Sequence, residues 1–371
     1  AEIDMGQAPP GDSYNGEGNG IPLIAGASDF GDLTPRPTRH TNAPTKVSRT
    51  GDIILCIRAT IGDLNLSDQP YCLGRGVAGL RPKPKRLNHR FLWRALEANA
   101  DNLRSRGRGA TFLQVSKSDI ANLEITLPPL DEQKRIAGIL DQADALCRLR
   151  AQALDKLNTL GQAIFHEMFG DPTANIKDLP VKSLGEVCSF ISGGTPNKSN
   201  PLFWGGDFPW VSPKDMKKLR ICDAEDHVTQ QAFESTNLKT IEIDTPLIVV
   251  RGMILAHTVP LAITTRPVAI NQDMKAIKFD DTVIPEFGLW CLKAQHDSIL
   301  TRVDTAAHGT KRLDTEVLKT LPIFSLPKES QNEFIEKIYE CDRQISRYRK
   351  QILDFEKIFS SLQHHAFRGE L

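Results

Sequence analysis

The clearest pattern of hydrophobic and polar positions lies near the C-terminal end of the chain. Apolar residues recur alternately four and three positions apart from Phe334 to Ala366, which is the spacing of a coiled-coil seam. A looser version of this pattern runs through the middle of the chain. No proline interrupts either pattern, so we predict two long helices, over 129–169 and 328–371. The predicted seam residues are Ile139, Ala143, Leu146, Leu157 and Leu160 in the first helix and Ile338, Ile345, Ile352, Phe355, Phe359 and Leu362 in the second.

A proline-containing joint precedes both helices. The first joint reads "LPPLDEQKRIAGIL" (127–140) and the second "LPKESQNEFIEKIY" (326–339). Ser330 followed by Glu333 is a capping-box pattern, and Asp131 is the candidate cap of the first helix. The second joint replaces "DEQ" with "SQN", which predicts that the two joints differ in their contacts with partner proteins.

The rest of the chain repeats in the same order. "GDIILCIR" (51–58) matches "TPLIVVR" (245–251), and "FLWRALEA" (91–98) resembles "FGLWCLKA" (287–294). At least five such pairs are co-linear, which indicates a duplicated unit. Short apolar and β-branched runs between Gly, Pro, Asn and Asp predict strands and turns, with a helix around 89–103 and another around 285–300.

We therefore predict an α+β fold with two repeated globular α/β domains, over 1–128 and 170–327. The two long helices separate these domains. Copies related by a pseudo-two-fold axis would pair the helices as an antiparallel coiled coil. The alternative is that each long helix packs only on its own domain.

Composition and motifs argue against several classes of protein. The chain has 371 residues and zero net charge, and no apolar run reaches the 18 residues of a membrane span. Its seven cysteines form no CxxC pair and no signal-peptide pattern opens the chain, which predicts reduced thiols in the cytoplasm. Neither a Walker loop nor a G-x-G-x-x-G motif after a strand is present. The sequence predicts no catalytic residue, no metal site and no cofactor bound by this chain.

Positive charge is concentrated in one part of the neutral chain. Between 75 and 108 the chain has ten arginines and lysines but only two acidic residues, Glu97 and Asp101. Such a local excess of positive charge is typical of a surface that contacts phosphates. "RSRGRGATF" (104–112) and "AAHGTKRLD" (306–314) are basic, glycine-containing loops at matching places. Arg58 and Arg251 each end an apolar run. They are either DNA ligands or members of a structural salt bridge that both repeats share. Arg94 either contacts DNA or lies on the buried side of a helix. The DNA-binding candidates are Arg36, Thr38, Arg39, His40, Arg58, Arg75, Lys83, Lys85, Arg86, Arg104, Arg106, Arg108, Lys198, Lys214, Arg251, His257, Gln272, Lys311 and Arg312.

The joint "LPPLDEQKRIAGILD", the motifs "GQAP" (6–9) and "GGTP" (193–196), and the closing "AFRGEL" resemble the specificity subunit of Type I restriction–modification systems. The resemblance covers essentially the whole chain. It implies two target-recognition domains that each read one half of a split DNA sequence, and two helices that set the unread spacer. It also implies a non-catalytic subunit that binds double-stranded DNA, two methyltransferase subunits, which use S-adenosylmethionine, and restriction subunits, which use ATP and Mg²⁺.

Two other classes of function stay open at this point. A diverged DNA methyltransferase or nuclease would do chemistry itself, and a scaffold would bridge two proteins without reading DNA. The start "AEIDMG" lacks a counterpart of "VKSLGEVC" (181–188), so we expect either a trimmed chain or a leading strand from elsewhere. Domains of one fold read different bases through different loop residues, so the sequence predicts neither the target nor the spacer length.

Overall fold

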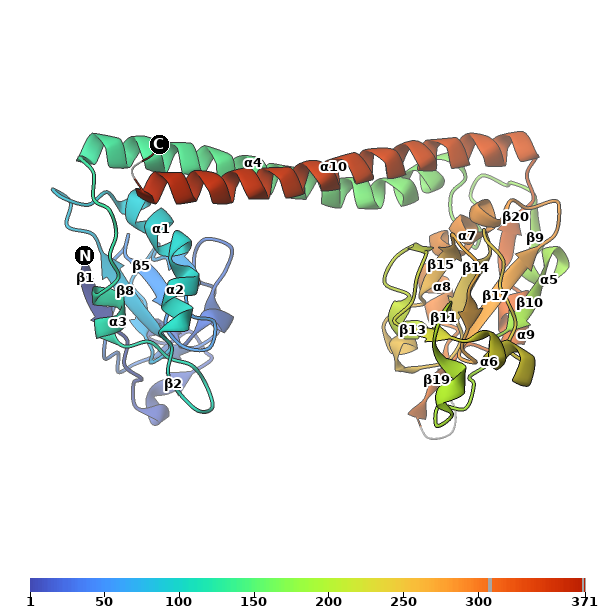
Figure 1. Cartoon of the computed structure of the whole chain (residues 1–371), viewed down its shortest axis with the longest axis horizontal. Helices are drawn as coiled ribbons and strands as arrows, with labels where there is room; N and C mark the ends of the chain where they lie inside the picture. Colours follow the sequence, from blue (N-terminus) through green and yellow to red (C-terminus); the bar gives the residue numbers. More distant parts are fainter. Residues whose placement is uncertain (306–308, 369, 371) are drawn as a thin grey trace. The chain divides into compact units, whose positions relative to one another are not determined.

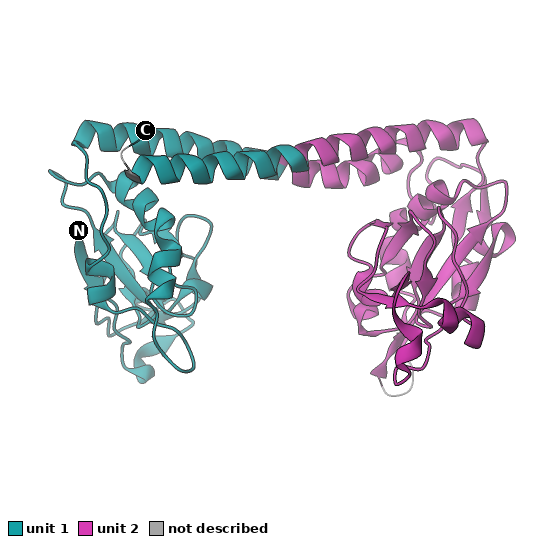
Figure 2. Cartoon of the chain, viewed as in Figure 1, with its two compact units in different colours: residues 1–152, 349–371 teal, residues 153–348 magenta. Residues whose placement is uncertain are grey.

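The computed structural model describes residues 1–305, 309–368 and 370. The chain divides into two compact units, which Figure 2 colours separately. Unit 1 comprises residues 1–152 and 349–371, and unit 2 comprises residues 153–348. The long helices α4 (Leu130–Met168) and α10 (Lys328–Arg368) each contribute one part to each unit.

Unit 1 is built on an antiparallel sheet of order β1-β8-β5-β6 and a smaller sheet of order β2-β4-β3-β7. Figure 1 labels β1, β5 and β8 of the first sheet. All four residues of β5 are buried, because both faces of the strand are covered: Ile53 and Leu55 pack in one core cluster and Ile54 in another. Asn88 caps α1 by accepting a hydrogen bond from the Phe91 amide. The elements are β1 (Glu2–Met5), β2 (Tyr14–Asn15), β3 (Ile21–Ile24), β4 (His40–Thr41), β5 (Ile53–Cys56), β6 (Leu64–Leu66), β7 (Cys72–Leu73), β8 (Val77–Arg81), α1 (His89–Ala98), α2 (Ala100–Ser105) and α3 (Lys117–Ala121).

Unit 2 contains a sheet of order β10-β17-β14-β15-β12 and a smaller one of order β13-β11-β16. Two further strand pairs, β18-β19 and β20-β9, complete the unit. The elements are β9 (Val181–Ser183), β10 (Cys188–Ser192), β11 (Trp204–Val211), β12 (Arg220–Ile221), β13 (Asp226–Val228), β14 (Pro246–Val249), β15 (Leu261–Thr264), β16 (Ala269–Ile270), β17 (Met274–Phe279), β18 (Asp304–Thr305), β19 (Lys311–Arg312), β20 (Pro322–Phe324), α5 (Leu184–Val187), α6 (Gln230–Ser235), α7 (Pro285–Ala294), α8 (His296–Leu300) and α9 (Thr315–Lys319).

The two units share one topology. The order β1-β8-β5-β6 in unit 1 corresponds to β10-β17-β14-β15 in unit 2, with antiparallel pairing throughout. Each smaller sheet contains one parallel pair, β3-β7 in unit 1 and β11-β16 in unit 2. The predicted α+β fold and duplication are confirmed. The helices predicted around 89–103 and 285–300 are each broken in two, at Asn99 and Gln295.

Parts of α4 and α10 pack together in an antiparallel manner inside each unit. In unit 1, Arg150 on α4 donates a hydrogen bond of 2.6 Å to Gln351 on α10. Ten residues earlier, Leu140 packs in the same core cluster as Ala366. In unit 2, Phe165 lies 5.2 Å from Phe334 between ring centroids. The prediction that the helices pair with each other is therefore confirmed within each unit.

The predicted seam of the first helix is partly wrong. Leu146 is 48% exposed and Leu160 is 38% exposed, so neither lies in a closed seam. One series of α4 positions with a strict four-three spacing, one position away from these leucines, is buried at least partly at every member. Its members are Ile136, Leu140, Ala143, Cys147, Arg150, Leu154, Leu157, Gly161, Ile164 and Met168. Several of these positions are only weakly apolar, which is why hydrophobicity alone gave the wrong phase.

The starts of the long helices also differ from the prediction. α10 begins at Lys328 and α4 at Leu130, so Ser330 and Asp131 lie inside the first turn and are not N-cap residues. Glu333 pairs instead with Lys337 along the helix. In the part of the chain that the structure describes, no helix is long and apolar enough to cross a membrane.

Candidate nucleic-acid interface

In unit 1, the end of β5 meets a loop that returns from α2. The Val115 amide donates to the Ile57 carbonyl, and the Ala59 amide donates to the Leu113 carbonyl. Arg58 therefore lies at the exposed end of the strand, bridged to Gln114. Gln114 is bridged on its other side to Arg108, through two backbone hydrogen bonds of 3.0 Å each.

A tight turn brings a third arginine to the same strand end. Arg75 lies between Gly74 and Gly76, and the Gly76 carbonyl accepts a hydrogen bond of 2.9 Å from the Ile57 amide. A β-carbon on Gly76 would lie only 2.1 Å from the Ala25 carbonyl oxygen, so this turn requires glycine. Cluster 1 is the name used below for Arg58, Arg75, Arg108 and Gln114.

Aromatic surface accompanies the charge of cluster 1. The Arg58 guanidinium lies 5.3 Å from the centroid of the Phe112 ring, which is 54% exposed. Such stacking holds the guanidinium plane in place without neutralising its charge.

Unit 2 repeats this arrangement at the end of β14. Arg251 is bridged to Arg312 on β19, and the Gly252 amide donates to the Lys311 carbonyl. The Val250 amide donates to the Asp273 carbonyl at 2.8 Å, which places the turn residue Gln272 beside the strand end, as Arg75 is placed in unit 1. Cluster 2 is the name used below for Arg251, Gln272, Lys311 and Arg312.

The glycine of the short motif near the start of each repeat supports the same turns. A β-carbon on Gly6 would lie 2.0 Å from the Gly74 carbonyl, and one on Gly193 would lie 2.0 Å from the Asn271 carbonyl. Both glycines therefore allow the chain to approach the turn that carries Arg75 or Gln272. The Gly194 amide donates a hydrogen bond to the Ile270 carbonyl, just before the turn that carries Gln272. The loop with the exposed Lys198 therefore begins beside this turn.

Other candidates lie near the clusters or apart from them. Arg36, Thr38 and Arg39 are exposed before β4, and His40 is part of β4. His257 is exposed after the 3-10 helix Met253–Ala256, which contacts β19. Residues 306–308 of the second predicted basic loop lie outside the described residues.

The basic residues of the 75–112 stretch, for which the sequence predicts DNA contact, do not all lie on one surface. Lys83, Lys85 and Arg86 are exposed but follow β8, whereas Arg75 precedes it, so the length of the strand, roughly 17 Å, separates them. The Arg86 carbonyl is bound by Gln133 at the start of α4. These three side chains therefore belong to the surface near the joint and not to cluster 1.

Several other arginines of this stretch already have partners within unit 1. Arg106 donates to the Asn102 side chain and to the carbonyls of Asp119 and Asn122, and Arg104 pairs with Asp101. Arg81 forms a 2.6 Å ion pair with the buried Asp52. Sequence spacing shows the number of charges but not these tertiary partners.

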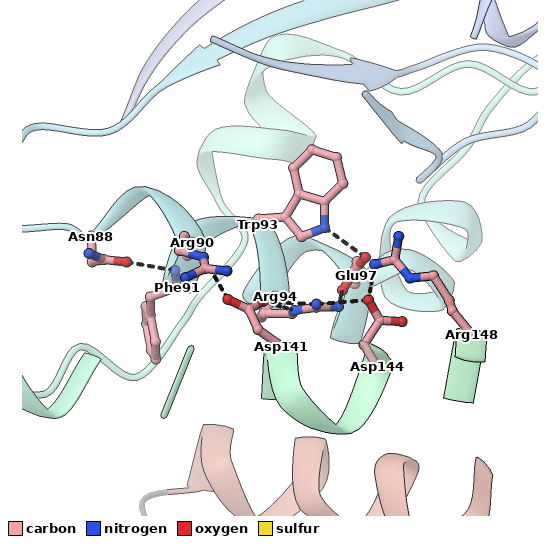
Figure 3. A network of polar contacts seen from close by, with 9 residues as sticks. All are labelled: Asn88, Arg90, Phe91, Trp93, Arg94, Glu97, Asp141, Asp144 and Arg148. Atoms are coloured by element: carbon pink, nitrogen blue, oxygen red, sulfur yellow. Dashed lines mark hydrogen bonds and ion pairs between the residues drawn. The ribbon is translucent and has the colours of Figure 1, made fainter. Parts of the chain in front are cut away.

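Arg94 is the most buried of these arginines, with 4% of its surface exposed. Its guanidinium pairs with Asp141 at 2.8 Å and with Asp144 at 2.9 Å, both on α4 (Figure 3). Burial by itself would lower the pKa of Arg94, but the neighbouring carboxylates, Glu97 foremost, outweigh burial and raise the pKa. Arg90 pairs with Asp141 as well, so both arginines attach α1 to α4.

Lys214 in unit 2, one of the predicted DNA-binding residues, is paired with two carboxylates. Its ammonium lies 3.0 Å from both Glu225 and Asp226. Hydrogen bonds to these two carboxylates raise its pKa and offset its charge. Among the described residues, no group of three or more His, Cys, Asp or Glu side chains is arranged to hold a metal ion.

Two neutral residues at cluster 1, its member Gln114 and the neighbouring Phe112, were missed by sequence reasoning. They carry no charge, and a search for basic residues passes over them. Their signal in the sequence is positional, because Phe112 ends the basic loop 104–112 and Gln114 follows two residues later.

The chain was compared with known families and structures. The model of the family described as Type I restriction modification DNA specificity domain matches residues 1–159 and 176–354. The chain belongs to this family. The chain is 35% identical over 165 residues to a protein of Methanocaldococcus jannaschii, which is assigned as the type I restriction enzyme MjaX specificity subunit. It is 30% identical over 204 residues to the EcoR124I/EcoR124II specificity subunit of Escherichia coli.

The match to the M. jannaschii protein covers 44% of this chain and 39% of that protein. The match to the E. coli protein covers 54% of this chain and 48% of that protein. The chain therefore spans less than half of the length of these curated relatives. Solved structures share its fold at 19% identity. They include the S subunit of a type I restriction–modification system from M. genitalium, with a TM-score of 0.54, covering 99% of this chain and 93% of that one. A chain from a study of complex assembly in a type I R-M system gives a TM-score of 0.67, covering 98% of this chain and 100% of that one.

Proposed function

We propose that this chain is the non-catalytic DNA-reading subunit of a type I restriction–modification enzyme. Each unit reads one half of a split target with the cluster at its strand end. The observation that supports this most strongly is the recurrence of one strand-end arrangement in both units, with Arg58 and Arg251 at the same place.

The clusters have the chemistry that base reading requires. Among the described residues, Arg58, Arg75 and Arg251 have no carboxylate within ion-pair distance, so their guanidinium groups are available to a ligand. Arginine and lysine recognise guanine edges, and glutamine recognises adenine edges, when a strand or loop carries them into a groove. Lys311 and Arg312 in cluster 2 are less free, because Thr305 and Asp314 hold their ends.

Clusters of different composition favour different bases on the same scaffold. The turn carries Arg75 in cluster 1 and Gln272 in cluster 2. An arginine-for-glutamine exchange at one place changes the preferred hydrogen-bonding pattern while the backbone stays the same. The two halves of the target are therefore expected to differ in sequence.

The proposed partners follow from this role. The subunit binds double-stranded DNA and carries methyltransferase subunits on the exposed faces of α4 and α10, and two such subunits would match the duplication. S-adenosylmethionine then belongs to the methyltransferase subunits, and ATP and Mg²⁺ to restriction subunits of the full enzyme. A complex that acts on cellular DNA works in the cytoplasm.

Selection from a randomised duplex library tests the proposal. The full chain, with its methyltransferase subunits, is incubated with the library, and the retained duplexes are sequenced. We expect a motif in two parts, separated by a fixed number of unread base pairs. A single contiguous motif, or no enrichment, would overturn the proposal. Binding of S-adenosylmethionine by the chain alone would indicate a methyltransferase instead.

A further inference from the structure

One buried amide ties three segments of unit 1 together. Gln133, in the first turn of α4, is 1% exposed. Its Oε1 accepts a hydrogen bond of 2.8 Å from the Asn88 amide at the start of α1. Its Nε2 donates to the carbonyls of Arg86 at 3.0 Å and of Pro128 at 2.8 Å. The side chain therefore joins the long helix, the proline-containing joint and α1. The part of each unit outside the two long helices is called the module below.

Unit 2 makes the same three bonds with Gln331, which is fully buried. Its Oε1 accepts from the Ile284 amide at 2.8 Å, before α7. Its Nε2 donates to the carbonyls of Thr282 at 2.9 Å and of Leu326 at 2.8 Å. The glutamine of "DEQ" is therefore kept in "SQN", shifted by one position.

A second attachment lies on the same face of each long helix. Asp144 follows Gln133 by eleven residues, and Asp342 follows Gln331 by eleven residues. Eleven residues make about three turns and a rise of roughly 16 Å, so each glutamine and its aspartate share one face. Asp144 is bound by Arg94 of α1 at 2.9 Å, and Asp342 by Arg220 of β12 at 2.8 Å.

The cations at this second attachment come from different elements. In unit 1, Arg94 projects from α1, whereas in unit 2 Arg220 comes from β12 and also pairs with Glu286 of α7 at 2.6 Å. The acidic partner on the long helix is nevertheless at the same place in both units. Attachment of the module at this point is therefore a shared feature, although the two units achieve it with unrelated residues.

We propose that Gln133 with Asp144, and Gln331 with Asp342, are positioning residues that fix the angle of each module on its long helix. A module held at one point can rock about it, whereas two points roughly 16 Å apart remove that freedom. This inference rests on the proposed function, because a fixed angle in each unit then defines the distance between the DNA half-sites. These residues act through the reading clusters and do not touch DNA.

Selection from the same randomised library tests the inference when the number of unread base pairs is scored. The variants are Gln133→Leu and Gln331→Leu in the full chain with its methyltransferase subunits. Gln142→Leu, at an exposed position of α4, is the matched control. We expect both half-site motifs to persist in the variants. The preference for the wild-type gap over gaps longer or shorter by one base pair should fall about tenfold, since only part of the free energy of the three lost hydrogen bonds acts on the angle of the module.

A second pair of variants keeps the test valid if the glutamine variants do not fold. Asp342→Asn changes a side chain that is 39% exposed, and Asp155→Asn, on the exposed surface of α4, is its control. Asp342→Asn should also broaden the range of gaps. An unchanged gap in folded Gln133→Leu, Gln331→Leu and Asp342→Asn proteins would overturn the inference and leave these residues a purely structural role. Absence of a split motif in the wild type would refute the proposed function instead.

Discussion

Two glycines in α4 should respond in opposite ways to the same substitution. Gly161 is buried in unit 2, where a β-carbon would lie 2.6 Å from Cη2 of Trp290 and 3.2 Å from Cδ1 of Ile338. The Trp290 ring is packed edge-on against Phe334, with 5.7 Å between ring centroids, so it has little room to move. Gly138, in the same helix but in unit 1, has no atom within 4 Å of its β-carbon position.

The two effects can be weighed at each position. Alanine in a helix interior stabilises by about 1 kcal/mol relative to glycine. Overpacking a filled core costs about 1–3 kcal/mol, and the 2.6 Å approach at Gly161 favours the upper part of that range. We therefore expect Gly161→Ala to lower the free energy of unfolding by about 1–2 kcal/mol and Gly138→Ala to raise it by about 1 kcal/mol.

Urea unfolding, followed by circular dichroism and tryptophan fluorescence, measures both changes. Three of the four tryptophans, Trp204, Trp210 and Trp290, lie in unit 2, so fluorescence reports mainly on the unit that contains Gly161. Gly161→Ala should move the unit 2 transition to lower urea, and Gly138→Ala should move the unit 1 transition to higher urea. Stabilisation by both substitutions would refute the reasoning, because it would mean that Trp290 does not close over α4.

Three further outcomes are expected. Arg94→Leu should lower the free energy of unfolding of unit 1 by about 3–5 kcal/mol, because Asp141 and Asp144 lose a buried cation, and Arg104→Leu at an exposed pair should change it little in the same urea assay. Burial opposes ionisation of Asp144, but hydrogen bonds from Arg148 and Arg94 outweigh it and lower its pKa. Its contribution is therefore complete above its ordinary pKa and lost on acidification, so the difference in stability between wild type and Asp144→Asn should shrink from pH 6 to pH 3. Lys214→Ala should leave the affinity for DNA and its salt dependence unchanged, whereas Arg251→Ala should weaken binding in a salt titration.

Periodicity and repetition were enough to predict the architecture. The four-three spacing predicted two long helices, and the structure has them at Leu130–Met168 and Lys328–Arg368. Co-linear short strings predicted two copies of one unit, and the matching order of strands confirms this. These signals are local or repeated, so a single sequence contains them in full.

The phase of the first helix could not be predicted in the same way. Its closed seam includes Cys147 and Gly161, whereas Leu146 and Leu149 are largely exposed. A count of hydrophobic residues favours the leucines over a cysteine or a glycine, because the packing depends on the partner helix. Arg150 also lies in the seam, with its guanidinium 4.3 Å from the Phe355 ring centroid.

The residues of the candidate site were predicted only in part, because the partners of a side chain are again not visible in the sequence. Arg58 and Arg251 were recognised from their matching places, and the structure gives each a cluster at the end of its strand. Neither lies in a salt bridge among the described residues, which removes the structural alternative left open by the sequence. Arg81 and Arg94 counted toward the charge excess but pair with carboxylates distant in sequence. Net charge in a window does not distinguish these roles, because the acidic partners lie outside it.

The central claim is that each unit reads one half of the target. It is tested most directly by base-preference profiles of two matched variants, Arg58→Ala and Arg251→Ala, measured on the selected duplex with every position changed in turn. We predict that Arg58→Ala flattens the preference in one half only, that Arg251→Ala flattens it in the other half only, and that the gap stays the same. Loss of preference in the same half with both variants, or equal weakening on every sequence, would contradict the account.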